Sequence, residues 1–191
     1  MSSFAMPWLR LLAGVAAMAV LCSAAKPPAC PQVEKTASGA HLKISSSLNK
    51  ALAAAAPGFH PWTMSDYTES ARKSYKVTKA QAPWAVVADF DGDGFCDLVV
   101  DGRTKTDTYR LCAWGSSEGP RVMTLARHRL TSAPGRSTAA LTLVSKADVD
   151  RFIELAKGDS LVGVVFGEQA GGKLARLYYW RRGKFAQVDA K

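Results

Sequence analysis

The stretch "ADFDGDGFCDLVV", residues 88–100, decides how the rest of this sequence is interpreted. It places four aspartates at alternating or near-alternating positions, although the formal net charge of the chain is +9. Carboxylates this close repel one another unless something positive lies among them. Because an apolar run follows, we expect the acidic residues to form a loop that leads into a buried strand.

The spacing of the loop residues predicts a calcium site. Ca²⁺ prefers about six to eight oxygen ligands, held by a loop that turns sharply around the ion. The expected ligands, at loop positions 1, 3, 5, 7 and 9, are the side chains of Asp89, Asp91, Asp93 and Asp97 and the backbone carbonyl of Phe95. Gly94 permits the tight turn, and Gly92 removes a side chain where the loop is most crowded.

An EF-hand is excluded by the sequence around the loop. An EF-hand needs a bidentate Glu at position 12 and a helix on each side. Position 12 is Val100, and both flanks are β-like. A calcium sensor that opens a pair of helices is therefore not expected.

The segment resembles the calcium loop of the FG-GAP repeat, also called the VCBS-like repeat, of integrin-type propellers and many exported bacterial proteins. The strand "AVVADF", the loop "DGDGFCD" and the strand "LVV" carry the resemblance, about 17 of the 191 residues. It implies a structural calcium ion between two antiparallel strands. A propeller needs at least about four blades, and this chain has one such motif, so a complete propeller is not expected. The alternative is a metal-free Asp/Gly turn, since both residues are common in turns.

The beginning of the chain predicts export. Residues 1–25 contain one cation, Arg10, then an uncharged apolar run and small residues that suit cleavage after Ala24 or Ala25. The apolar run is short for a membrane helix, which needs about 20 residues, although a retained anchor is the alternative. We expect a periplasmic or secreted protein without a membrane span, whose charge falls to +8 when Arg10 leaves.

The remaining sequence predicts one α+β domain over residues 46–191, preceded by an irregular tether over residues 26–45. Residues 46–56 are expected to form a helix, with a short helix possible over residues 65–74. A further helix, with Val149, Phe152, Ile153 and Ala156 on one face, is expected within residues 145–159. About eight strands after Pro83 predict an antiparallel sheet on which the helices pack. The expected strands lie at 84–90, 97–102, 108–115, 121–130, 138–145, 161–167, 173–182 and 183–189.

The cysteines of an exported chain can form a disulfide. A hairpin turning around Lys105 would place Cys96 opposite Ala113, one residue from Cys112, and a bulge could absorb that difference. We therefore predict a bridge between Cys96 and Cys112, with two buried free thiols as the alternative. Cys30 would then be free or paired between chains.

Catalytic motifs are not recognisable in the sequence. His41, His60 and His128 are scattered, and no Gly-x-Ser-x-Gly elbow or phosphate-binding glycine loop occurs. We expect a non-catalytic binding or structural role in the cell envelope, with an envelope hydrolase or an enzyme inhibitor as the alternative. The sequence does not indicate an oligomeric state.

A third alternative is a basic and aromatic patch that binds an acidic glycan or another polyanion. Its residues would be Tyr178, Trp180, Arg181, Arg182 and Lys184. Nucleic acid is not an expected partner of an exported protein. The simpler interpretation is that the aromatic residues pack in the sheet core while the cations form a hairpin turn.

Overall fold

The computed structural model describes residues 29–37, 39–130, 136–152 and 161–189. This part of the chain holds twelve strands in three sheets, together with three α-helices and one short 3₁₀ turn, Met64–Asp66. The helices are α1 (Ser46–Ala55), α2 (Glu69–Ser74) and α3 (Lys146–Phe152). The strands are β1 (Gln32–Thr36), β2 (Gly39–Lys43), β3 (His60–Pro61), β4 (Gln81–Ala82), β5 (Ala85–Ala88), β6 (Asp97–Arg103), β7 (Asp107–Trp114), β8 (Arg121–Arg129), β9 (Ala139–Leu143), β10 (Val162–Ala170), β11 (Lys173–Arg181) and β12 (Lys184–Asp189).

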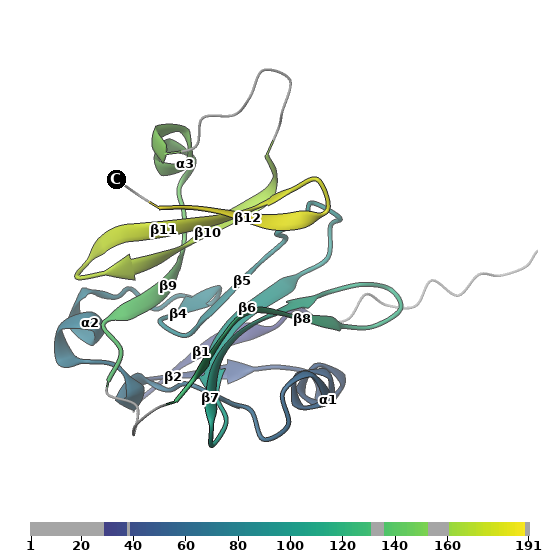
Figure 1. Ribbon diagram of the computed structural model, residues 1–191, viewed down its shortest axis with the longest axis horizontal. Coiled ribbons are helices and arrows are strands. Elements are labelled where there is room, and N and C mark those ends of the chain that lie inside the picture. Colours follow the sequence, from purple (N-terminus) through teal and green to yellow (C-terminus); the bar gives the residue numbers. More distant parts are fainter. Residues whose placement is uncertain (1–28, 38, 131–135, 153–160, 190–191) are drawn as a thin grey trace, which may run out of the picture.

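The sheets form layers (Figure 1). A six-stranded antiparallel sheet has the order β4-β5-β6-β7-β8, with β3 paired to β6, and a four-stranded sheet has the order β12-β11-β10-β9. The four-stranded sheet covers one face of the larger sheet, while α1 and the β1–β2 hairpin cover the other. Helix α3 lies beyond the four-stranded sheet, so four layers enclose three clusters of buried side chains.

Strand β6 lies at the centre of this arrangement and is buried on both faces. Successive side chains of a strand point to opposite faces. Leu98 and Val100 therefore enter the core beneath α1 and the β1–β2 hairpin, and Val99 enters the core between the two large sheets. All three are fully buried, which is why the sequence here is a continuous apolar run.

Helix α1 forms where the sequence predicts it. The Ser45 hydroxyl accepts a hydrogen bond from the backbone N–H of Leu48 at 3.2 Å, which caps the first turn, and a run of alanines propagates the helix. Leu48 and Leu52 lie on one side and are buried against the six-stranded sheet. The predicted helix over residues 46–56 is confirmed to within one residue.

The eight strands expected after Pro83 correspond one to one with β5 to β12, but they do not form the single sheet predicted: β5 to β8 belong to the six-stranded sheet and β9 to β12 form the four-stranded sheet packed on it. The sixth of them, β10, is an inner strand of its sheet, although its first residues are not covered on both faces, since Val162 and Val164 are exposed. Its Phe166 faces the six-stranded sheet, and its Val165 packs with Val149 of α3 on the opposite face. The other expected apolar positions of that helix, Phe152, Ile153 and Ala156, lie outside the side chains that the structure describes.

The irregular tether predicted over residues 26–45 is wrong for most of its length. Gln32–Thr36 and Gly39–Lys43 form the antiparallel β1–β2 hairpin, which begins two residues after Cys30. Val33 and Leu42 face each other across the hairpin and are both buried in the core near α1. The apolar pattern is weak because each strand contributes only this one buried residue, and the other side chains face solvent or the rim.

The predicted signal peptide, residues 1–25, lies outside the described part of the chain. Among the residues that are described, no helix is long and apolar enough to cross a membrane.

Candidate metal centre

The acidic loop connects two neighbouring antiparallel strands. Ala88, the last residue of β5, pairs with Asp97, the first residue of β6, so residues 89–96 must reverse the chain within a narrow gap. Gly92 and Gly94 adopt φ values of +78° and +88°, a region that other residues rarely enter. The glycines therefore allow the reversal that brings the aspartates together.

The aspartate side chains fold the loop around themselves. Asp89 accepts hydrogen bonds from the backbone N–H groups of Gly92, at 2.6 Å, and Gly94, at 2.9 Å. Asp91 accepts from the N–H of Asp93 at 3.2 Å, and Asp93 accepts from that of Phe95 at 2.8 Å. These short-range contacts turn the backbone inward, as Asp commonly does in turns.

Asp97 fixes the loop to the rest of the sheet. One carboxylate oxygen accepts from the backbone N–H of Phe90 at 2.9 Å, and the other accepts from that of Gly115 at 2.9 Å. The residue is fully buried, and this burial raises the pKa of its carboxyl to about 6. The two N–H donors oppose the rise, whereas the nearby charges of Asp91 and Asp93 add to it.

The structure brings three of the four predicted carboxylates together. Oxygen atoms of Asp89, Asp91 and Asp97 all lie within 4.8 Å of one another, so the group could hold a metal ion. Burial also raises the pKa of Asp91, and the neighbouring carboxylates of Asp93 and Asp89 contribute to the shift. A cation between the three oxygens would offset this repulsion.

The other two predicted ligands are the Asp93 carboxylate and the Phe95 carbonyl. The Asp93 carboxylate is exposed and is not part of the group of three. It instead accepts the N–H of Phe95. The Phe95 carbonyl remains a predicted ligand.

Strand β10 supports the loop from outside, a contribution that the sequence did not predict. The N–H of Val164 donates to the carbonyl of Asp89 at 2.8 Å. A Cβ atom on Gly163 would lie 2.2 Å from the carbonyl oxygen of Phe90, so only glycine fits at this close approach. Gly163 within an otherwise apolar strand was the signal that a neighbouring backbone approaches here.

The predicted disulfide between Cys96 and Cys112 is wrong. Cys96 instead bonds to Cys30, at a Cα–Cα distance of 5.4 Å. Leu98 pairs with Ala113, which moves the register by two residues from the one expected and places Cys112 opposite Val99. Cys112 is thus a free cysteine in the core between the sheets, and burial raises the pKa of its thiol.

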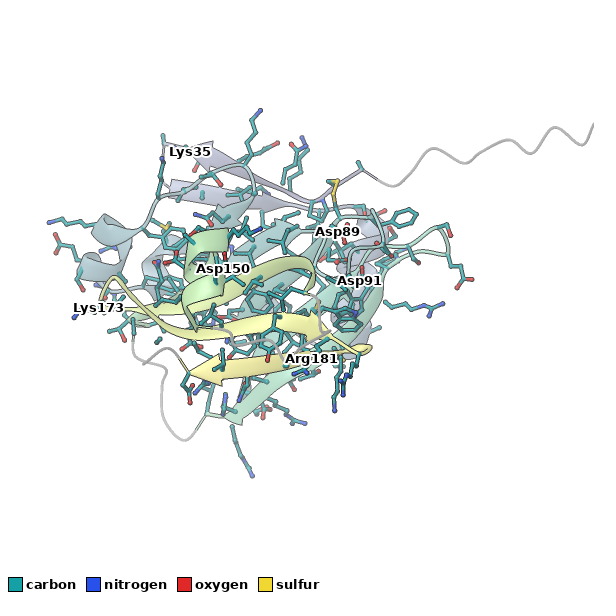
Figure 2. The ribbon with its side chains drawn as sticks, turned by 90° about the horizontal axis from the view of Figure 1, so that it is seen from above. Lys35, Asp89, Asp91, Asp150, Lys173 and Arg181 are labelled. Carbon is teal, nitrogen blue, oxygen red and sulfur yellow. A yellow bond between two sulfur atoms is a disulfide. The ribbon has the colours of Figure 1, made fainter. Side chains whose placement is uncertain are left out.

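The predicted basic and aromatic patch does not gather on one surface. Tyr178 is buried and stacks on Phe166 at 4.8 Å, and Trp180 packs against Trp114 at 4.6 Å, both between the sheets. Arg182 and Gly183 form a two-residue turn between β11 and β12, and Lys184 begins β12. Arg181 lies toward the same end of the molecule as Asp89 and Asp91 (Figure 2). The simpler interpretation of this segment, core aromatics followed by a cationic hairpin turn, is confirmed.

No protein-family profile matches the chain, and neither a curated protein nor a solved structure matches it.

The raised pKa of Asp97 predicts that mild acid stabilises the metal-free protein. The folded state holds a proton on this carboxyl up to about pH 6, whereas the unfolded chain releases it near its ordinary value, so stability should rise as the pH falls from 7 to 5. We expect a gain of about 1–2 kcal/mol in the free energy of unfolding, measured by urea denaturation in excess chelator. Asp97→Asn cannot titrate and should lose most of this gain, whereas the exposed Asp93→Asn control should keep it. Equal pH dependence in the two variants would contradict the assignment to Asp97.

The disulfide gives a second prediction. Cys30→Ser should lower the free energy of unfolding by about 4 kcal/mol in the chain-entropy model, because the bridge joins residues 66 apart. Reductant should remove the difference between wild type and variant. A non-reduced digest should contain the Cys30 and Cys96 peptides joined together, and a joined Cys96 and Cys112 pair would refute this connectivity.

Proposed function

We propose that this protein is an exported, non-catalytic component of the cell envelope in which a structural calcium ion braces the acidic loop. The observation that carries the proposal is the convergence of Asp89, Asp91 and Asp97 within 4.8 Å at the junction of β5 and β6. Asp93 and the Phe95 carbonyl complete the proposed ligand set. The protein's role is to bind or support an envelope component.

The chemistry of the donors favours calcium over other metals. All proposed ligands are oxygen atoms, which suit hard cations and are poor ligands for soft ones. Mg²⁺ demands nearly octahedral geometry and releases its water reluctantly, whereas Ca²⁺ accepts many oxygens in irregular arrangements. An irregular loop closed by two glycines suits calcium better.

A structural role is favoured over a sensory one by the way the loop is held. Asp97 is anchored to Phe90 and Gly115, Asp89 is bonded to β10, and Cys96 is tied to Cys30. These contacts hold the carboxylates close together before an ion enters. Calcium binding would therefore stabilise the existing fold and would not convert one fold into another.

Two further observations support this proposal. A disulfide between the described cysteines suits an oxidising compartment outside the cytoplasm. The antiparallel pairing of β5 with β6 on either side of the loop also supports the resemblance to the FG-GAP repeat.

Calcium should raise the melting temperature of the chelator-treated protein. A ligand present at about 100 times its dissociation constant adds about 2.7 kcal/mol to the free energy of unfolding. Asp91→Asn should abolish most of this gain, because it removes a ligand charge while keeping an acceptor for the N–H of Asp93. Asp150→Asn, an equal change of charge at an exposed position on α3 (Figure 2), should retain the full gain.

The measurements are thermal unfolding and calorimetric titration with Ca²⁺, repeated with Mg²⁺. We expect binding heat and a rise in melting temperature with Ca²⁺, and smaller effects with Mg²⁺. The absence of both effects at millimolar Ca²⁺ would refute the calcium site.

A further inference from the structure

The space between the two large sheets is filled at one end and open at the other. Aromatic side chains close the end near the acidic loop: Phe90, Trp114, Phe166, Trp180 and Phe185. At the other end the sheets enclose a cleft of about 460 Å³, lined by residues from both. This volume lies within the range of about 300–1,000 Å³ that is typical of small-molecule sites.

A network of charged and polar side chains forms the base of the cleft, and Arg110 of β7 is its centre. The guanidinium donates to both carboxylate oxygens of Asp101, at 2.8 and 2.9 Å. It also donates to Glu168 at 3.0 Å and to the Tyr178 hydroxyl at 2.7 Å. The network thus joins β6 and β7 of one sheet to β10 and β11 of the other, and the Arg110 side chain is only 13% exposed.

These contacts argue against an anionic ligand. Four of the five N–H donors of Arg110 already have acceptors, and its two carboxylate partners together carry one more charge than it does. The second arginine of the cleft, Arg176, donates to Asp189 at 2.7 Å. An incoming phosphate or carboxylate would therefore face carboxylates and cations that are already paired.

An apolar ligand is also disfavoured, because it would strip water from the polar groups of the cleft without replacing their hydrogen bonds. Several of those groups retain capacity for a polar ligand. The Tyr178 hydroxyl accepts from Arg110 and still has its own hydrogen to donate, and Glu168 has a second oxygen. The exposed side chains of His128 and Gln187 also line the cleft.

The Trp62 ring lines the cleft together with those of Tyr109 and Tyr178. Trp62 is half-buried, and its ring packs edge-on against Tyr67 at 5.6 Å, which fixes its position at the wall of the cleft. A fixed indole offers an apolar face beside polar groups. Such a surface suits a ligand that has C–H groups on one side and hydroxyl groups around its edge.

We propose that the cleft between the sheets binds a neutral saccharide, on the basis of the Arg110 network, whose donors are nearly all in use, the remaining hydrogen-bonding groups and Trp62. The hydroxyl groups of the sugar bond to Tyr178, Glu168 and Gln187, and the face of one ring packs on the indole. This inference goes beyond the proposed calcium site, lies at the other end of the inter-sheet space and does not depend on it.

The test is an NMR titration of the isotope-labelled protein with three neutral disaccharides, cellobiose, maltose and N,N′-diacetylchitobiose. Glucuronate and inorganic phosphate serve as anionic probes. Concentrations on the order of 10 mM detect dissociation constants near 1 mM. At least one neutral sugar should shift the Trp62 indole signal and the amide signals of β7 and β11, while the anionic probes leave them unchanged.

Two variants examine the assignment. Tyr178→Phe keeps the ring stacked on Phe166 and removes only the hydroxyl, so it should weaken binding about threefold to tenfold, the loss of one or two neutral hydrogen bonds. The double variant His128→Ala, Gln187→Ala changes only exposed side chains and should weaken binding similarly. It tests the same site if Tyr178→Phe fails to fold. His41→Ala, on the β1–β2 hairpin, is the matched control and should bind as wild type does.

Three results would overturn the proposal. The first is that none of the neutral sugars shifts the cleft signals. The second is that only glucuronate or phosphate does so, which would indicate an anion site. The third is that a neutral sugar binds with unchanged affinity in the folded cleft variants, which would place its site elsewhere.

Discussion

Burial of β6 on both of its faces is the constraint on which the rest of the structure depends. The strand separates two cores, so its side chains must satisfy opposite environments at successive positions. Asp97, Val99 and Asp101 point to the same side, the space between the two large sheets. Both aspartates are buried there, and each is matched by donors: backbone N–H groups for Asp97 and the Arg110 guanidinium for Asp101. The candidate metal centre and the polar cleft are thus built from one face of one strand, with an apolar and aromatic layer between them.

Much of the fold could be predicted from the sequence because its main elements have strong periodic patterns. Helix α1 has its apolar residues at helical spacing, and the eight strands from β5 to β12 are short β-like runs separated by turn residues. The β1–β2 hairpin could not be recognised, because one buried residue in each strand leaves no period to detect. Strands β3 and β4 have two residues each, which is too short for an alternation of apolar and polar residues to be recognised.

The acidic loop was the part of the site that the sequence indicated best, since its spacing and its glycines are local features. The contacts that position it were not local. Gly115 lies 18 residues from Asp97, and Cys30 lies 66 residues from Cys96. The cleft could not be predicted for the same reason, because Arg110 is 58 residues from Glu168 and 68 residues from Tyr178 along the chain. The sequence places Tyr178 in a candidate surface patch, and only the packing of the two sheets shows that its hydroxyl reaches Arg110.

The connectivity of the cysteines has a consequence for how the chain must oxidise. In an unfolded chain, loop closure becomes less frequent with length roughly as the power −3/2, so Cys96 meets Cys112 about eightfold more often than it meets Cys30. The native bridge therefore forms against the statistical preference of the unfolded chain. Pairing of β6 with β7 reverses this preference, because it places Cys112 opposite Val99 and buries its thiol away from Cys96. The order of events in oxidative folding thus decides the outcome: if the sheet assembles first, the accessible partner of Cys96 among the described cysteines is Cys30.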